Sequence, residues 1–257
     1  MPPDPSTNTF PPPPPRGSFP ATQWSMVLRA GEGSETQVHA ALASLCRQYW
    51  YPLYTFIRRQ GRAHHEAEDC TQEFLARLLA SDGMARARPE RGRFRTFLLA
   101  SLRNFLVNEW QRERAAKRGG GVANLPLDFD TAAERFAREP ADPGLSPEQA
   151  FDRNWAISMV ERVVAELRLE YEKSGRGVLF AALEPLIWSN PGPDKFAAPA
   201  ARLGLASHAF TMALHRVRRR LGERLRARVA EIVADEAEID AELRHLSAAL
   251  AGSTSPA

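Results

Sequence analysis

The sequence contains only two cysteines among its 257 residues, Cys46 and Cys70, and neither has a nearby partner for a metal cage. Two isolated thiols are typical of a reducing compartment, so we expect a cytoplasmic protein. No run of about 18 apolar residues occurs, which predicts that no segment spans a membrane. The N-terminus also lacks the basic-then-apolar pattern of a secretory signal.

Signals for enzyme chemistry are weak. No Ser/His/Asp or Cys/His constellation is apparent, and Gly119 to Gly121 lack the preceding strand and the following Lys-Ser/Thr of a phosphate-binding loop. One run suggests a metal cluster at first: His64, His65, Glu66, Glu68, Asp69 and Cys70. Neighbours along a helix point in different directions, so these six side chains cannot all converge on one ion. We predict no catalytic residue, no metal site and no cofactor.

Strict alternation of polar and apolar residues is almost absent, whereas apolar residues recur at helical spacing from about Trp24 onward. Hydrophobic residues make up 44% of the chain, which is enough to build real cores. We therefore predict an all-α fold of two small helical domains joined by a flexible linker, the C-terminal one a helix-turn-helix. The expected parts are a Pro-rich tail (1–21), a first domain (22–118), a linker (119–145), a second domain (146–232) and a C-terminal extension (233–257).

In the first domain the pattern predicts helices over about 35–59, 66–80 and 94–117, with a bend or break at Pro52. The second helix presents one polar face, formed by Glu68, Asp69, Gln72 and Glu73. Acids near a helix N-terminus also suit the helix dipole, so this face has both a structural and a protein-binding interpretation.

In the second domain, Ser146 followed by Pro147 is a strong start signal for a helix that should run to about residue 173. A shorter helix is predicted near 178–188, and a further helix near 235–250 should pack on the domain. Near Gly204 a short helix, a tight turn and a second helix from about Ser207 form a helix-turn-helix pattern, which also occurs in ordinary helical bundles. The residues expected to point outward from the second of these helices are His208, Thr211, Met212, His215 and Arg219.

Net charge is only +3, but the positive charge is concentrated. Residues 86–118 contain ten Lys or Arg against three acids, and residues 174–230 contain the same numbers. Such runs are either solvated helix faces or phosphate-binding surfaces, and two of them on one chain favour nucleic acid held at two places. Arg216, Arg218, Arg219 and Arg220 strengthen this interpretation for the helix-turn-helix, because guanidinium groups bind phosphate and guanine well.

The upstream basic helix mixes arginines with amides opposite its buried stripe. The polar side is formed by Arg103, Asn104, Asn108, Gln111, Arg114 and Arg118. Amide and aromatic groups can hold unstacked bases while arginines hold the backbone. Most aromatic residues of this helix fall on the inner stripe, and only Trp110 is a candidate surface aromatic.

Three segments resemble motifs of the sigma-70 family of bacterial RNA polymerase sigma factors. Residues 66–79 (EAEDCTQEFLARLL) are similar to the second conserved helix, and residues 92–110 (GRFRTFLLASLRNFLVNEW) to the helix that meets the −10 promoter element. Residues 201–205 (ARLGL) and 214–221 (LHRVRRRL) resemble the C-terminal helix-turn-helix that meets the −35 element. The order of these motifs, over about 22–230, most resembles the small, two-domain extracytoplasmic-function type.

The resemblance implies that the protein binds core RNA polymerase and promoter DNA and performs no bond chemistry. The polymerase would bind Glu68, Asp69, Gln72 and Glu73. The −10 side would be Arg103, Asn104, Asn108, Gln111 and Arg114. The −35 side would be His208, Thr211, Met212, His215, Arg216 and Arg219. The resemblance also allows for an anti-sigma factor as a further partner.

The recognition region departs from the family pattern at several positions. Ala206 stands where Ser or Thr is usual, His208 where Gly is frequent, and Thr211 where Lys or Arg is frequent. Pro199 falls inside a usually helical stretch, where we expect it in the first turn of a helix. Two other functions are left open by the sequence: a helix-turn-helix regulator that acts without polymerase, and a helical scaffold that binds acidic proteins through its arginines.

Overall fold

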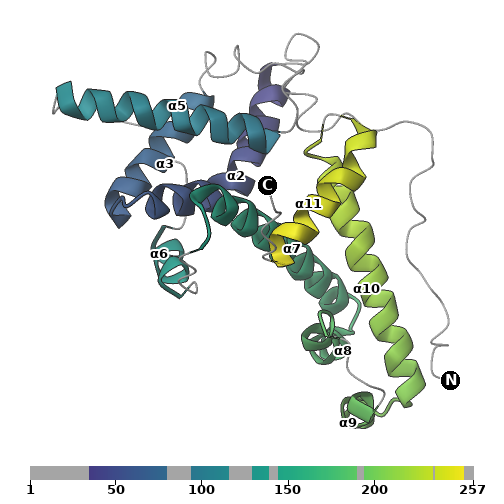
Figure 1. The fold of residues 1–257 in the computed structure, drawn as a ribbon. Helices are drawn as coiled ribbons and strands as arrows, with labels where there is room; N and C mark the ends of the chain where they lie inside the picture. Colours follow the sequence, from purple (N-terminus) through teal and green to yellow (C-terminus); the bar gives the residue numbers. More distant parts are fainter. Residues whose placement is uncertain are drawn as a thin grey trace.

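The computed structural model describes residues 35–79, 94–115, 129–138, 144–189, 194–233 and 235–251. Every regular element in these ranges is a helix, which confirms the predicted all-α fold (Figure 1). The α-helices are α2 (Glu35–Arg59), α3 (His64–Leu79), α5 (Phe94–Ala115), α6 (Phe129–Arg138), α7 (Pro147–Lys173), α8 (Gly177–Leu183), α9 (Asp194–Arg202), α10 (Ser207–Ala230) and α11 (Ile239–Ala251). Two short 3-10 helices are η2 (Glu184–Leu186) and η3 (Glu236–Glu238). The predicted tail at 1–21 lies outside the described residues.

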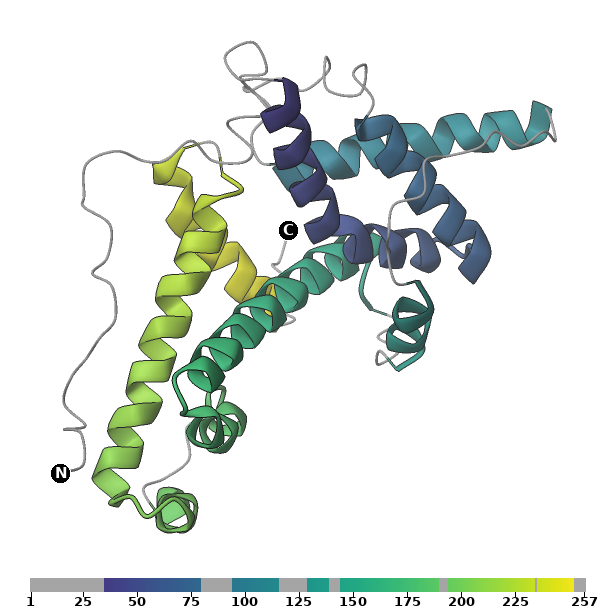
Figure 2. The same cartoon turned by 180° about the vertical axis from the view of Figure 1, so that it is seen from behind.

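Helix α2 contains Pro52 in its interior and changes direction along its length (Figure 2). Proline cannot donate to the carbonyl four residues earlier, and its ring crowds that carbonyl, so a bend is expected here. The Thr55 hydroxyl donates to the Pro52 carbonyl at 2.9 Å in the turn that follows. The predicted bend is therefore present, and the helix continues through it.

Helix α7 begins with a reciprocal capping arrangement. The Gln149 backbone N–H donates to the Ser146 hydroxyl at 3.2 Å, and the Ser146 N–H donates to the Gln149 side-chain oxygen at 2.8 Å. Pro147 occupies the first helical position, where its missing N–H costs nothing. These groups satisfy donors that a helix start leaves free, and the predicted start is confirmed.

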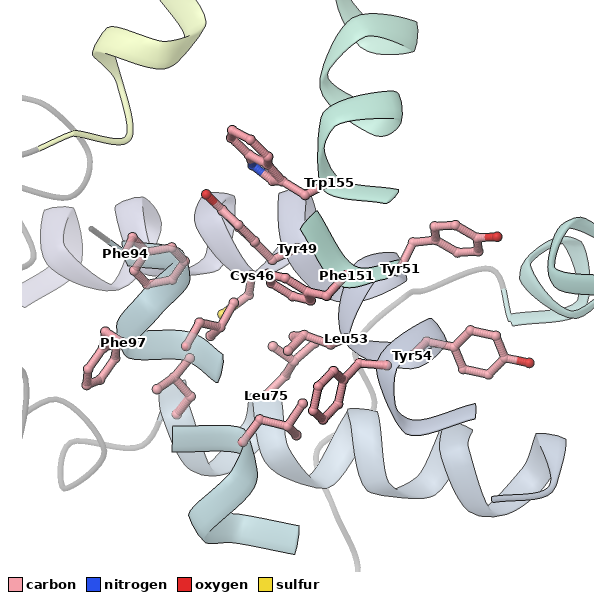
Figure 3. Packing of buried hydrophobic residues seen from close by; sticks show 14 of the residues in the cluster. Cys46, Tyr49, Tyr51, Leu53, Tyr54, Leu75, Phe94, Phe97, Phe151 and Trp155 are labelled. Atoms are coloured by element: carbon pink, nitrogen blue, oxygen red, sulfur yellow. The ribbon is translucent and has the colours of Figure 1, made fainter. Parts of the chain in front are cut away.

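The two ends of α7 belong to different cores. Near its start, Phe151 and Trp155 stack on Tyr49 of α2, with ring centroids 6.2 and 6.5 Å apart, and all three rings are buried (Figure 3). Near its end, Leu167 and Tyr171 are buried in a second cluster with α8, α9 and α10. One unbroken helix of 27 residues thus contributes to both cores.

This arrangement differs from the expectation of two separate domains on a flexible linker. The predicted linker contains α6, which packs on α2: the Arg135 guanidinium lies 4.3 Å from the Tyr51 ring centroid, and Arg58 lies 4.7 Å from that of Phe136. The amphipathic pattern of this ten-residue helix is short and lies among glycines, prolines and acids, so the surrounding composition concealed it.

The C-terminal extension packs at the junction between the two parts. Ile239 and Leu246 of α11 are buried in the first core, together with Val229 from the end of α10. Figures 1 and 2 show α11 lying across α7 and the C-terminal end of α10. The expected packing of this extension is present, and it reaches the first core as well as the second domain.

Because α7 is shared, its aromatic residues should dominate the stability of the fold. We expect Trp155→Ala to lower the free energy of unfolding by about 3–5 kcal/mol, since it empties a fully buried position. Leu169→Ala on the same helix is the control, because Leu169 is 55% exposed and should change stability by less than about 0.5 kcal/mol. Urea unfolding followed by circular dichroism measures both, and equal effects would contradict the packing of α7.

Candidate nucleic-acid interface

Helices α9 and α10 are joined by a tight turn at Gly204, which has a φ of +65°. Glycine adopts this left-handed conformation without the steric cost of a Cβ. The Leu205 N–H donates to the Ala200 carbonyl at 2.9 Å and closes the turn. Pro199 lies in the interior of α9, so the expectation that it occupies a first turn is wrong. Phe196 and Ala200 on either side of it are buried in the second core and hold α9 in place.

Helix α10 buries one stripe and exposes the other. The buried stripe is Phe210, Ala213, Leu214, Val217 and Leu221. On the other side His208, Met212, His215, Arg216 and Arg219 are exposed. Thr211 is half-buried, and its hydroxyl donates to the Ser207 carbonyl at 3.0 Å within the helix. The six residues named from the sequence therefore lie on the side of α10 that faces away from the second core.

Arg219 lies 3.5 Å from Glu223, one turn further along the same helix, and stays exposed. The arginines of α10 other than Arg216 and Arg219 contact other elements. Arg218 donates to the backbone carbonyls of Leu186, Ile187 and Ser189 at the end of η2. Arg220 and Arg224 both pair with Glu170 of α7. The sequence argument counted Arg218 and Arg220 toward nucleic-acid binding, and the structure corrects it, because these side chains join elements of the second core.

The C-terminal half of α10 is tied down in the same way. Arg226 pairs with Asp240 of α11 at 2.5 Å, and Arg228 pairs with Glu166 of α7 at 2.5 Å. Burial opposes the charge of Arg228, but the carboxylates of Glu231 and Glu166 raise its pKa above the ordinary value. The positive surface of α10 is therefore concentrated near its N-terminal half, around Arg216 and Arg219.

On α5, Arg103, Asn104 and Asn108 are exposed, as predicted. Arg103 pairs with Glu148 in the first turn of α7 at 2.5 Å. Partial burial opposes ionisation of Glu148, but hydrogen bonds from Arg103 and the cap hold its pKa below the ordinary value. Gln111 and Arg114 lie within α5, but their side chains, like that of Trp110, are outside the described set.

The polar face of α3 carries charge of mixed sign. Asp69 is exposed, Gln72 donates to Glu68 at 3.4 Å, and Glu73 pairs with Arg77. Arg77 also reaches Glu109 of α5 at 3.0 Å, so it ties the two helices together. Asp69 and Glu68 are left as the acids whose charge is least neutralised by an arginine.

Three of the six candidate metal ligands come together at the start of α3. Ligand atoms of His64, His65 and Glu68 all lie within 4.8 Å of one another. However, His64 Nδ1 is 2.9 Å from the Tyr54 hydroxyl and shares a hydrogen bond with it. A helix N-terminus also carries positive partial charge, which opposes a bound cation. These observations favour a structural role for the cluster.

Comparison with known protein families bears on the first part of the chain. Residues 45–116 match the family model described as sigma-70 region 2, from the middle of α2 through α3 to the end of α5. The match supports a sigma-70 family sigma factor. A sigma-70 region 2 implies transcription initiation with RNA polymerase and contact with promoter DNA. We call α2, α3 and α5 the region 2 unit, and α7 to α11 the C-terminal body.

No curated protein and no solved structure matched the chain. Among the helices that the structure describes, none is both long and apolar enough to cross a membrane.

Substitution of an α10 arginine that makes internal contacts should destabilise the fold, whereas substitution of an exposed one should not. We expect Arg218→Ala to lower the free energy of unfolding by about 1–3 kcal/mol, because three carbonyls lose a charged donor. Arg216→Ala, two residues away and exposed, should change it by less than about 0.5 kcal/mol. Thermal unfolding of both variants tests this distinction. It is wrong if Arg216→Ala lowers the free energy of unfolding more than Arg218→Ala does.

Proposed function

We propose that the protein is a sigma factor of the extracytoplasmic-function type that binds core RNA polymerase and directs promoter recognition and opening. The observation that carries the proposal is the region 2 match over α2, α3 and α5. The α9–α10 pair supports it, because this second helical element presents an exposed basic and polar surface. The protein supplies binding energy and position, and the chemistry of RNA synthesis belongs to the polymerase.

In this proposal the exposed side of α10 reads the −35 duplex. An α-helix fits the major groove, and its outward residues near the N-terminus reach base edges. Arg216 and Arg219 suit phosphate or guanine, while His208, Thr211 and His215 offer hydrogen bonds and Met212 offers apolar contact. The internally paired arginines position α10 on the C-terminal body.

The −10 element would bind the polar side of α5, through Arg103, Asn104, Asn108, Gln111 and Arg114. Arginines on this side hold phosphates, and amides suit the edges of unstacked bases. Glu68, Asp69, Gln72 and Glu73 of α3 would dock on the polymerase. The ECF type, the boundary of the −35 unit and a cytoplasmic location belong to this same proposal.

Two other functions remain as outcomes of the test. A helix-turn-helix regulator would bind duplex through α10 without polymerase. A scaffold for acidic proteins would use its arginines for protein contacts, but many of the described arginines of α10 already pair within the chain. Co-purification with core polymerase, followed by sequencing of the transcripts that it starts, separates the three. A stable complex that starts at defined sites is expected.

The proposed duplex-binding surface can be tested by comparing two arginines of α10. Arg219→Ala should weaken promoter duplex binding by about 1–3 kcal/mol if it contacts a base, or reduce the salt slope by about 1 if it contacts a phosphate. Arg224→Ala removes the same charge from the same helix, but Arg224 pairs with Glu170 of α7 and should have little effect. Fluorescence anisotropy at several salt concentrations gives both the affinity and the salt slope. If the two variants lose duplex affinity equally, Arg219 is not part of the duplex-binding surface.

The docking surface makes a separate prediction. Asp69→Ala should lower the affinity for core polymerase about tenfold, as expected for one exposed charge at the centre of an interface. Glu172→Ala, which removes an exposed acid from the far end of α7, should leave that affinity unchanged. Neither variant should alter duplex binding by the free protein. If Asp69→Ala retains full core affinity, the acidic side of α3 is not the docking surface.

A further inference from the structure

A cleft of about 390 Å³ lies between α2, α6 and α7. In both views of the fold α5 lies above α2 and α6 below it, so the cleft is away from the predicted −10 surface (Figures 1 and 2). None of its lining residues belongs to the predicted polymerase-binding or −35 surfaces. Sites for small molecules have volumes of roughly 300–1,000 Å³. The cleft therefore has the size of a ligand site, and the proposed function does not use it.

Apolar and aromatic groups form part of the wall of the cleft. Ala132 of α6 is buried and belongs to the first core. Tyr51 of α2 is buried too, whereas the neighbouring Trp50 is only partly buried, and the two rings meet edge to face with centroids 5.8 Å apart. Both rings line the cleft. Because planar rings stack on aromatic side chains, the partly exposed indole of Trp50 gives such a ligand a surface to cover.

Three arginines line the same cleft, one from each helix. They are Arg47 of α2, Arg135 of α6 and Arg162 of α7, and Glu161 is the one acid among the lining residues. Arg135 pairs with Glu161 at 2.9 Å, and its guanidinium lies 4.3 Å from the Tyr51 ring centroid, so two contacts fix its position. The lining residues therefore carry an excess of positive charge, which favours an anionic ligand.

Arg47 and Arg162 supply the charge that is not neutralised inside the cleft. Both residues are exposed, and neither forms an ion pair with a carboxylate in the described part of the chain. A guanidinium group matches the oxygens of a phosphate with two parallel hydrogen bonds. Thr131 of α6 and Ser158 of α7 add hydroxyl groups to the lining, and a hydroxyl can donate to a phosphate oxygen or accept from a sugar.

We propose that this cleft binds a small phosphorylated ligand that carries a planar ring, which is the chemistry of a nucleotide. The ring stacks on Trp50, and Arg47 and Arg162 hold the phosphate between α2 and α7. A bare anion would leave the aromatic wall uncovered, and an uncharged ring would leave both guanidinium groups without a partner. The site belongs to the free protein, so this inference goes beyond the proposed function and does not rest on it.

The cleft exists only in the folded chain, because its lining comes from three helices. Its residues lie at 47–51, 131–135 and 158–165, which are far apart in the sequence. A ligand that bridges α2, α6 and α7 therefore binds the folded state and not the unfolded chain. Such a ligand raises the temperature of unfolding, and the rise increases with ligand concentration.

The first experiment measures binding to the full chain by isothermal titration calorimetry. The probes are AMP, GMP, ATP and GTP, with adenosine and inorganic phosphate as the two halves of the ligand. At least one nucleotide should bind with a dissociation constant of roughly 10–100 μM, as expected for a ligand of this size in an open cleft. Adenosine and inorganic phosphate should each bind at least about tenfold more weakly, because each uses only one part of the cleft.

The second experiment places the bound nucleotide in the cleft. Arg47→Ala and Arg162→Ala should each lower its affinity about tenfold or more, because each removes a charged donor to the phosphate. Arg162→Lys keeps the charge and should lose less. Arg153→Ala is the matched control, since it removes an arginine from the same helix, α7, outside the cleft lining, and it should leave the affinity unchanged. Circular dichroism confirms that each variant is folded, and the substituted arginines of the cleft are exposed.

Three results overturn the nucleotide site. They are no binding of any of the four nucleotides at about 1 mM, equal affinity in the unmodified protein and in both Arg→Ala variants of the cleft, and binding of inorganic phosphate alone as tight as that of the nucleotides. Thermal unfolding with the bound nucleotide should show a higher unfolding temperature in the unmodified protein and in Arg153→Ala, and little rise in the two cleft variants. Failure to bind core polymerase overturns the proposed function instead, and these measurements do not depend on it.

Discussion

The continuous packing of α7 is the constraint on which the rest of the structure depends. Its first half supplies Phe151 and Trp155 to the core around Tyr49, and its second half supplies Leu167 and Tyr171 to the other core. A helix is stiff over this length because every interior residue is fixed by a hydrogen bond. Because both cores pack against this one stiff helix, the faces of α7 that they cover set the orientation of α5 relative to α10.

Charge is distributed over this frame in two ways. Arginines beside α7 or α11 pair with Glu166, Glu170 or Asp240 and hold helices together. Arginines beyond reach of these acids, Arg216 and Arg219, face outward. The same residue type thus has a structural or an interfacial role according to the carboxylates nearby, so a count of basic residues overestimates the surface available to nucleic acid.

The C-terminal extension joins the two parts of the structure. The region 2 match ends at residue 116, and α11 lies far beyond it in sequence, yet Glu242 is buried against Arg95 of α5. This contact joins residues 147 positions apart, across the boundary between the region 2 unit and the C-terminal body.

The sequence by itself determined most of the helices. Apolar spacing predicted α2, α3, α5, α7 and α10, and Ser146 with Pro147 predicted where α7 begins, because periodicity and capping are local properties. It also identified the outward residues of α10 and the likeness to sigma-70 factors. Only the tertiary structure decided that α7 serves two cores, that α6 lies within the expected linker, that Pro199 is inside α9, and that Arg218 and Arg220 are internal. These outcomes depend on partners tens of residues away, and local spacing carries no information about which distant surface a helix face will meet.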